Sequence, residues 1–270
     1  MVTLTLETEH ITFRSAIISA YSENPCQVLP NALWKTLKEI NKFETSLKIE
    51  NGVVTQLKAW KDDALYVYWN RDRSPPEIPE KRLESMKFAL VHQDFLKDFP
   101  TEKFDVMRPY FRLIHKNQKI KETKPPQGFR IANVDIKREI DIVADIIKKC
   151  YEDINVNPEI VKSWTKHPVF DPNLWIWVID SEKNTPAGLG IAEFDPTIRE
   201  GSLEWIQVLP EYRGKGIGKT IVLELLRRLQ DRAAFTTVSG EVNNKTKPEI
   251  IYRRCGFQGN DVWWLLIKNE

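Results

Sequence analysis

The chain has 270 residues and carries 40 lysines and arginines against 38 aspartates and glutamates, a formal net charge of +2. This length is enough for two ordinary domains with real cores. So small a net charge argues against a chain built as a basic nucleic-acid-binding surface. No apolar run approaches the roughly 18 residues that span a bilayer, so we expect no membrane partner.

Cysteine usage indicates the compartment. Cys26, Cys150 and Cys255 are odd in number and lack Cys-x-x-Cys spacing, which is typical of a reducing environment. The segment Met1–Glu7 lacks the basic start and apolar core of a signal peptide. We therefore expect a soluble cytoplasmic protein. The four histidines have no metal-ligand spacing, so no metal is expected.

The first half of the chain predicts both helices and strands. In chain order, we expect a helix at 32–43, a hairpin at 53–60 and 65–69, a longer helix at 79–99 and a strand at 107–116. No phosphate-binding loop occurs in this half. It is interpreted as an accessory domain, either helix-rich or α+β, that shapes the substrate side of a second domain.

A linker is predicted at 119–128, where a charged stretch is broken by two prolines and a glycine. We therefore expect an accessory domain over 1–124 and a second domain over 128–270.

In the second half, strands alternate with helices. The predicted strands are 129–134, 174–180, 187–194, 203–208, 236–242 and 262–267, and the predicted helices are 136–151, 158–166 and 219–232. Runs of antiparallel strands broken by helices predict an α+β domain of three layers.

The most informative stretch is 213–219, where a glycine-rich turn joins a buried strand to a helix. Such a turn leaves backbone N–H groups unpaired at the positive end of the helix dipole and so favours phosphate. Glycine lets the turn adopt left-handed angles and lets a diphosphate approach the backbone. The expected cradle is Arg213, Gly214, Lys215, Gly216, Ile217, Gly218 and Lys219.

Spacing separates three known phosphate loops. A Walker loop needs glycine where Arg213 stands. A dinucleotide fingerprint needs glycine or alanine where Lys219 stands. The pattern that fits is Arg/Gln-x-x-Gly-x-Gly/Ala, and the chain here resembles the GNAT superfamily of acyl-CoA N-acyltransferases.

A second segment resembles the same family. Asn243 and Asn244 precede Tyr252, which opens the Tyr-x-x-x-Gly-Phe pattern of the GNAT carboxyl-terminal region. This chain has Lys247-Pro248 where relatives have small helix formers. Proline is tolerated as the first residue of a helix, so we expect the helix to start late.

The resemblance implies a fold, a cofactor and a set of roles. The fold is a GNAT-like three-layer αβα domain with a mixed, mostly antiparallel sheet, and the acyl donor is acetyl-CoA. Residues 213–219 hold the diphosphate, and a backbone N–H near Val208 binds the thioester oxygen. Asn243 or Asn244 contacts the pantetheine arm, and Tyr252 protonates the departing thiolate.

The general base is left open. On an alternating strand Glu204 shares a face with Ile206 and Val208, which makes it the first candidate. Glu193 on the neighbouring strand is the second. Either carboxylate can instead be solvated or paired across strands, and water-mediated deprotonation needs no dedicated base.

The function implied is an N-acetyltransferase that uses direct attack in a ternary complex. The acceptor is the primary amine of a small molecule or a peptide. The alternative is a catalytically silent acyl-CoA-binding sensor or regulatory module. Tandem GNAT proteins exist, so the first 124 residues are alternatively a decayed GNAT-like domain. The sequence leaves the acceptor, the acyl length and the oligomeric state open.

Overall fold

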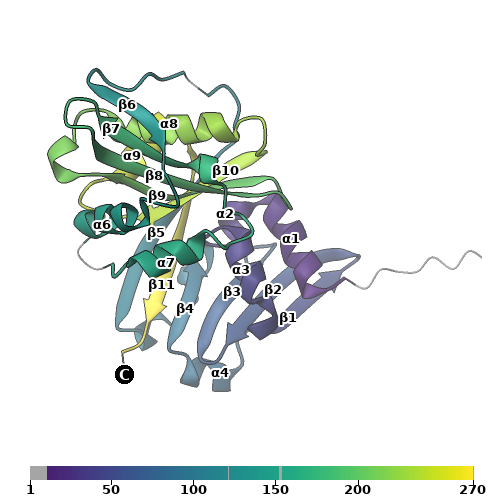
Figure 1. The fold of residues 1–270 in the computed structure, drawn as a ribbon. Helices are drawn as coiled ribbons and strands as arrows, with labels where there is room; N and C mark the ends of the chain where they lie inside the picture. The colour runs from purple at the N-terminus through teal and green to yellow at the C-terminus, as the bar shows by residue number, and fades with distance from the viewer. Residues whose placement is uncertain (1–10, 121, 152–153, 270) are drawn as a thin grey trace, which may run out of the picture. The chain divides into compact units, whose positions relative to one another are not determined.

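The computed structural model describes residues 11–120, 122–151 and 154–269 (Figure 1). The chain packs as two compact units, one containing Met1–Arg108 and Trp263–Glu270 and the other Pro109–Val262. The predicted linker at 119–128 therefore falls inside the second unit. Its composition is that of a linker. The strand before it, at 106–115, nevertheless pairs with the strand at 235–241 of the second unit, and this pairing places the segment in the second unit.

The first unit combines short helices with an antiparallel hairpin region. Its helices are α1 (Phe13–Glu23), α2 (Pro25–Val28), α3 (Leu33–Glu39), η1 (Ile40–Lys42), α4 (Glu80–Ser85), α5 (Gln93–Leu96) and η2 (Thr101–Lys103). Its strands are β1 (Glu44–Glu50), β2 (Val53–Lys61), β3 (Ala64–Asn70), β4 (Phe88–His92) and the last part of β11 (Gln258–Ile267).

The predicted hairpin is confirmed as β2 and β3, which pair antiparallel. The predicted helix at 79–99 is wrong over its middle, because Phe88–His92 is a strand that pairs with Trp263–Ile267. The partner strand comes from the far end of the sequence. Local periodicity carries no information about such a partner, so tertiary pairing overrides it.

The second unit contains the elements expected of the second half of the chain. Its strands are β5 (Val106–His115), β6 (Phe129–Asn133), β7 (Trp175–Asp180), β8 (Thr185–Asp195), β9 (Glu200–Val208) and β10 (Phe235–Glu241), with the first part of β11. Its helices are α6 (Ile140–Cys150), α7 (Pro158–Trp164), η3 (Pro172–Leu174), η4 (Pro210–Tyr212), α8 (Ile217–Leu229) and α9 (Pro248–Arg254).

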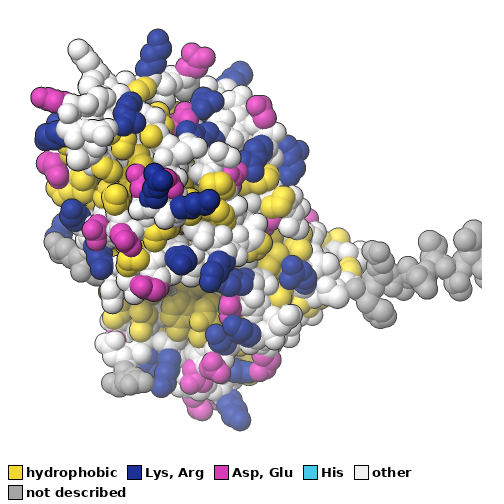
Figure 2. All heavy atoms as spheres, in the orientation of Figure 1, with side chains coloured by type: hydrophobic (Ala, Val, Ile, Leu, Met, Phe, Trp, Pro, Cys, Tyr) yellow, Lys and Arg dark blue, Asp and Glu magenta, His cyan; other side chains and the backbone are white. Residues whose placement is uncertain are grey.

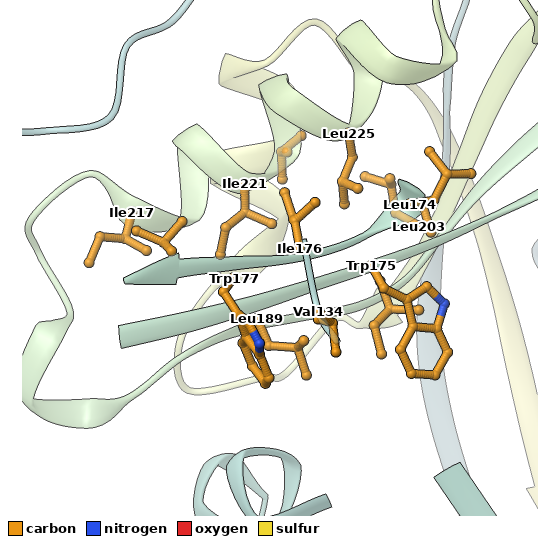
Figure 3. Close-up of a cluster of buried hydrophobic side chains, with 14 of the residues drawn as sticks. Val134, Leu174, Trp175, Ile176, Trp177, Leu189, Leu203, Ile217, Ile221 and Leu225 are labelled. Carbon is orange, nitrogen blue, oxygen red and sulfur yellow. The ribbon is translucent and has the colours of Figure 1, made fainter. Parts of the chain in front are cut away.

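The strands of this unit run in the order β5-β10-β9-β8-β7-β6. All neighbours are antiparallel except β10 and β9, which are parallel. The predicted α+β class with a mixed, mostly antiparallel sheet is thus confirmed. Figure 3 shows α8 packed on one face, with Trp177 and Leu189 pointing to the other. On that other face Trp177 donates its indole N–H to Glu139, the residue before α6, at 2.8 Å.

Close packing of α8 depends on glycine in β8. A Cβ atom at Gly190 would lie 2.4 Å from Ile221 Cγ2 and 3.1 Å from Leu225 Cδ1. Ile221 and Leu225 are fully buried. The missing side chain therefore lets the helix approach the sheet, and this approach places the first turn of α8 beside the ends of the strands.

We expect Gly190→Ala to lower the free energy of unfolding by about 1–3 kcal/mol, because the added methyl overpacks this contact. Urea unfolding measures the loss. Ile221→Ala creates space at the same point, so the double variant should be less destabilised than the sum of the two single variants. Simple additivity would show that the contact with Ile221 is not the cause.

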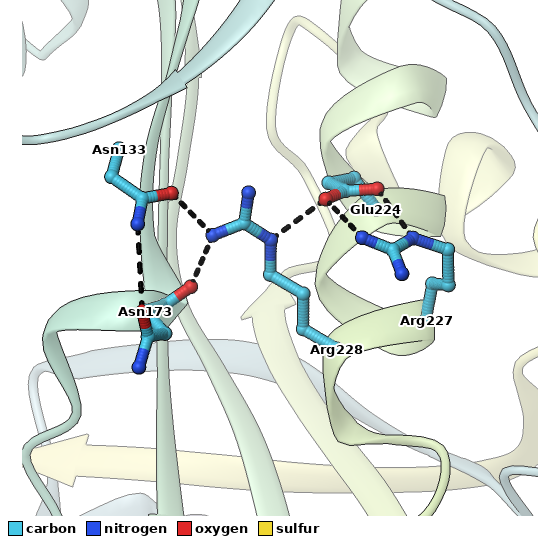
Figure 4. Close-up of polar contacts among 5 residues, drawn as sticks. All are labelled: Asn133, Asn173, Glu224, Arg227 and Arg228. Carbon is cyan, nitrogen blue, oxygen red and sulfur yellow. Dashed lines mark hydrogen bonds and ion pairs between the residues drawn. The ribbon is translucent and has the colours of Figure 1, made fainter.

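Charged side chains fix the far part of α8 (Figure 4). Glu224 accepts hydrogen bonds from Arg227 at 2.8 Å and from Arg228 at 2.7 Å. Arg228 also donates to Asn133 Oδ1 at 2.6 Å and to the Asn173 carbonyl oxygen. Burial alone would raise the pKa of Glu224, but the two guanidinium groups outweigh it and lower that pKa. The charged carboxylate holds Arg228, and Arg228 ties α8 to β6 and η3.

The described residues include no helix with the length and hydropathy needed to cross a membrane. On the face that Figure 2 shows, Lys and Arg side chains are interspersed with Asp and Glu.

Candidate functional site

The glycine-rich turn has the backbone conformation that its sequence predicts. Gly214 and Gly216 have φ angles of +80° and +82°, in the left-handed region that favours glycine. Gly216 is the N-cap residue of α8, which begins at Ile217. A Cβ at Gly214 would have no neighbour within 4 Å. Steric crowding by the protein therefore does not explain the glycine; the backbone angle does.

The turn presents a row of unpaired amides. Thr220 donates its N–H to the Gly216 carbonyl and so begins the helical pattern. Across the described parts of the chain, no acceptor takes the N–H groups of residues 214–219, and no side chain caps the helix. Backbone N–H groups at a helix N-terminus form an anion-binding site. The geometry therefore suits a phosphate group.

The two parallel strands separate beside this turn. β9 pairs with β10 only from Glu200 to Leu203, opposite Phe235 to Val238. Beyond Leu203, residues 204–208 of β9 continue along β8 alone. The backbone on the β10 side of this segment is thus left without a strand partner, which opens the edge of β9.

Val208 lies at the end of that open segment. It faces Gly188 in β8 while Leu209 N–H bonds to the Ala187 carbonyl, so Val208 and Gly188 form a pair without mutual hydrogen bonds. The Val208 N–H and C=O therefore point away from β8. The carbonyl receives the Arg213 Nε–H at 3.3 Å and the Cys150 thiol at 3.8 Å. Within the described residues the Val208 N–H has no acceptor.

The expected alternation of β9 breaks at Glu204. Trp205 pairs with Ile191 and Leu203 with Ala192, which leaves Glu204 as the extra residue of a β-bulge. The bulge interrupts the regular pairing at this residue, and the expected common face of Glu204 with Ile206 and Val208 stays a prediction. Glu204 is half-buried.

The second carboxylate considered as a base has a close neighbour. Glu193 is buried, and its Oε1 lies 3.8 Å from His167 Nδ1. Glu193 therefore has a histidine neighbour and is not an isolated carboxylate.

Tyr252 lies in the short helix α9, which starts at Pro248 as the sequence predicts. Its ring packs against Phe257 and Phe111, with centroids 5.7 and 6.1 Å away. Burial raises the pKa of Tyr252, and Tyr151 and Cys255 add to the rise. In the structure as described, its hydroxyl forms no hydrogen bond. The side chain is thus a protonated donor with nothing to donate to.

The two asparagines before α9 differ in their surroundings. Asn244 Oδ1 accepts hydrogen bonds from the Thr246 amide at 2.9 Å and the Thr246 hydroxyl at 2.7 Å. The Asn244 side chain therefore closes a local turn. Asn243 is exposed and, within the described chain, its side chain forms no such bond. The geometry favours Asn243 as the one available to a ligand.

The turn, the strand end and α9 meet at Gly218. A Cβ there would lie 3.7 Å from Val208 Cγ2 and 3.4 Å from Ile251 Cδ1, the residue before Tyr252. The Cys255 thiol contacts the Lys219 carbonyl at 4.0 Å. Residues predicted from two separate motifs are therefore brought together by tertiary packing.

The sequence analysis did not predict an aromatic cluster that contains Trp205 of β9. Trp205 stacks on Trp164 of α7 at 5.2 Å and 13°, and Tyr151 packs edge-on against Trp205 at 6.1 Å. Only the aromatic composition of three separate segments hinted at it. The three side chains come from β9, α7 and the end of α6, so only tertiary packing brings them together. Among the residues described, no group of three or more His, Cys, Asp or Glu side chains is arranged for a metal ion.

Comparison with known families identifies the segment that holds these features. Residues 172–259 match the family of Acetyltransferase (GNAT) domains. This range contains the glycine turn, the open end of β9 and Tyr252. The predicted resemblance to the GNAT superfamily is thereby confirmed over this segment. No curated protein matches the chain.

Solved structures extend the likeness of fold to most of the chain. A GCN5-related N-acetyltransferase from Sphaerobacter thermophilus has a TM-score of 0.67 at 14% identity, covering 94% of this chain and 91% of that one. A GNAT-family acetyltransferase from Colwellia psychrerythraea has a TM-score of 0.60 at 14% identity, and the match covers 97% of this chain and 98% of that one. A tandem GNAT protein from the clavulanic acid biosynthesis pathway has a TM-score of 0.54 at 11% identity, and the match covers 93% of this chain and 91% of that one. The fold is therefore GNAT-like.

Proposed function

We propose that this GNAT-like protein transfers an acetyl group from acetyl-CoA to a primary amine by direct attack in a ternary complex. The observation that carries the proposal is the amide-lined turn of α8 beside the point where β9 leaves β10. The turn suits a diphosphate, and the open edge of β9 suits the extended pantetheine arm of the cofactor. The second unit holds both. The first unit is proposed as an accessory domain.

The cofactor would be held mainly by backbone groups. The N–H groups of residues 214–219 and the positive end of the α8 dipole would bind the diphosphate. Lys215 and Lys219 are exposed and add positive charge. Arg213 acts differently, because its Nε–H bonds to the Val208 carbonyl and so holds the turn against the strand end.

The open edge of β9 would hold the reacting thioester. The Val208 N–H points toward this edge and would donate to the carbonyl oxygen as negative charge develops there. Asn243 would contact the pantetheine arm. Because the Arg213 and Cys150 contacts hold the Val208 carbonyl, the neighbouring N–H is set in place before the reaction begins.

Two proton transfers complete the reaction. Tyr252 would protonate the departing thiolate, since its raised pKa keeps the phenol neutral at physiological pH. The attacking amine must lose a proton. Glu204 at the bulge is the proposed base, and removal through water is the alternative.

Calorimetric titration of the full chain with acetyl-CoA, followed by thiol release with a panel of amines, tests the proposal. We expect a dissociation constant on the order of micromolar and thiol release that depends on one class of amine. Binding without release on any amine would favour a silent acyl-CoA sensor instead. Absence of binding by the folded protein would contradict both functions.

A further inference from the structure

Two lysine ammonium groups converge on one tyrosine ring beside the glycine turn. Lys215 Nζ lies 5.0 Å and Lys183 Nζ 5.4 Å from the centroid of the Tyr212 ring. Lys215 belongs to the turn itself, whereas Lys183 belongs to the turn between β7 and β8. Ammonium groups at this distance are attracted to the ring face. The fold therefore gathers two cations that the sequence keeps apart.

The ring that carries them is held rigidly. Tyr212 is buried, and its hydroxyl donates to Asp180 Oδ2 at 3.0 Å. Phe129 packs edge-on against the ring at 5.9 Å. Asp180 Oδ1 also accepts the Lys183 amide at 3.1 Å, which orders the turn bearing that lysine. One carboxylate thus positions both the ring and one of the cations.

The two ammonium groups remain available to a ligand. Both lysines are exposed, and in the described residues neither forms an ion pair with a carboxylate. The Lys183 side chain also bonds to Tyr212 and is attracted by Asp180, and these interactions raise the pKa of Lys183 and keep it charged. Each contact places a positive charge at the Tyr212 ring next to the glycine turn, and these charges favour an anion there.

Acetyl-CoA carries phosphate at two places, a central diphosphate and a phosphate monoester on the 3′ position of its ribose. The amides of residues 214–219 suit the first. We propose that Lys183 and Lys215, held on Tyr212, bind the 3′-phosphate and so make the protein discriminate CoA from dephospho-CoA. Lysine suits this role because it meets phosphate as a point charge. This inference rests on the proposed function.

The test compares two ligands that differ only in the 3′-phosphate. Calorimetry on the full chain should give CoA an affinity at least about tenfold higher than dephospho-CoA. Lys183→Gln should narrow that ratio by weakening CoA binding alone, and the Lys183→Gln/Lys215→Gln double variant should narrow it further. Lys137→Gln, at an exposed lysine before α6, should keep the full ratio. The ratio should also shrink as salt is raised.

Three results would overturn the inference. Equal affinities of the unsubstituted protein for the two ligands would remove it and leave the proposed function intact. An equal loss of both affinities in Lys183→Gln would show that this lysine does not read the 3′-phosphate. Absence of binding of either ligand by the unsubstituted protein would overturn the inference and the proposed function together.

Discussion

Gly216→Val is expected to abolish acetyl-CoA binding, with a loss of affinity of about a hundredfold or more. Gly216 has a φ angle of +82°, which a β-branched residue adopts only under strain. A Cβ atom at this position would meet only Pro126 Cγ, at 3.8 Å, so the protein itself has room for a side chain. Valine would therefore project into open space beside the turn, and we expect it to obstruct the approach of a diphosphate to the amides. Calorimetric titration measures the effect.

The matched control is Gly52→Val in the β1–β2 turn. Gly52 has a φ angle of +76°, and a Cβ atom there would have no neighbour within 4 Å, so it shares the backbone strain without the proposed ligand. Both variants should lose a similar amount of stability, about 1–3 kcal/mol. Only Gly216→Val should lose affinity. A folded Gly216→Val protein that binds acetyl-CoA normally would show that the turn is not the cofactor site.

Tyr252→Phe should lower kcat by about a hundredfold or more while changing acetyl-CoA affinity little, because a general acid acts in the transition state. The ring contacts with Phe111 and Phe257 remain in phenylalanine, so the fold should persist. Because burial raises the pKa of Tyr252, the phenol stays protonated throughout the neutral range. Any alkaline loss of kcat that comes from this group should therefore lie above the ordinary tyrosine value of 10.0.

Tyr68→Phe serves as the comparison, since it removes one buried phenol hydroxyl from the first unit, where the hydroxyl bonds to the Pro76 carbonyl. Its kcat should equal that of the unsubstituted protein. If Tyr252→Phe also retains full kcat, the tyrosine has no part in the mechanism. A parallel fall in kcat and affinity would instead indicate a structural role.

Local chemistry made the glycine turn predictable. Gly214 and Gly216 take left-handed angles, and this demand is visible in a short sequence because few other residues meet it. The apolar face of α8 is predictable for a similar reason, since Ile217, Ile221 and Leu225 recur at the helical period and all are buried. Pro248 likewise marks the start of α9.

Tertiary structure decided what depends on partners distant in the chain. The strand Phe88–His92 forms because Trp263–Ile267 lies beside it, and the helical spacing of 79–99 yields to that pairing. The bulge at Glu204 depends on how β9 matches β8, so the alternation of β9 alone does not reveal it. The approach of Lys183 and Lys215 to the Tyr212 ring likewise depends on packing between segments that are separate in the sequence.

The sequence by itself predicted the start of α9, the conformation of the glycine turn and the α+β class, because the first two depend on residues a few positions apart and the third on the order of the elements. Only the tertiary structure decided the division into units, the open edge at Val208 and the convergence of charges around the turn. Those features arise from strand pairing and side-chain packing between segments far apart in the chain, and such contacts leave no periodic or local trace.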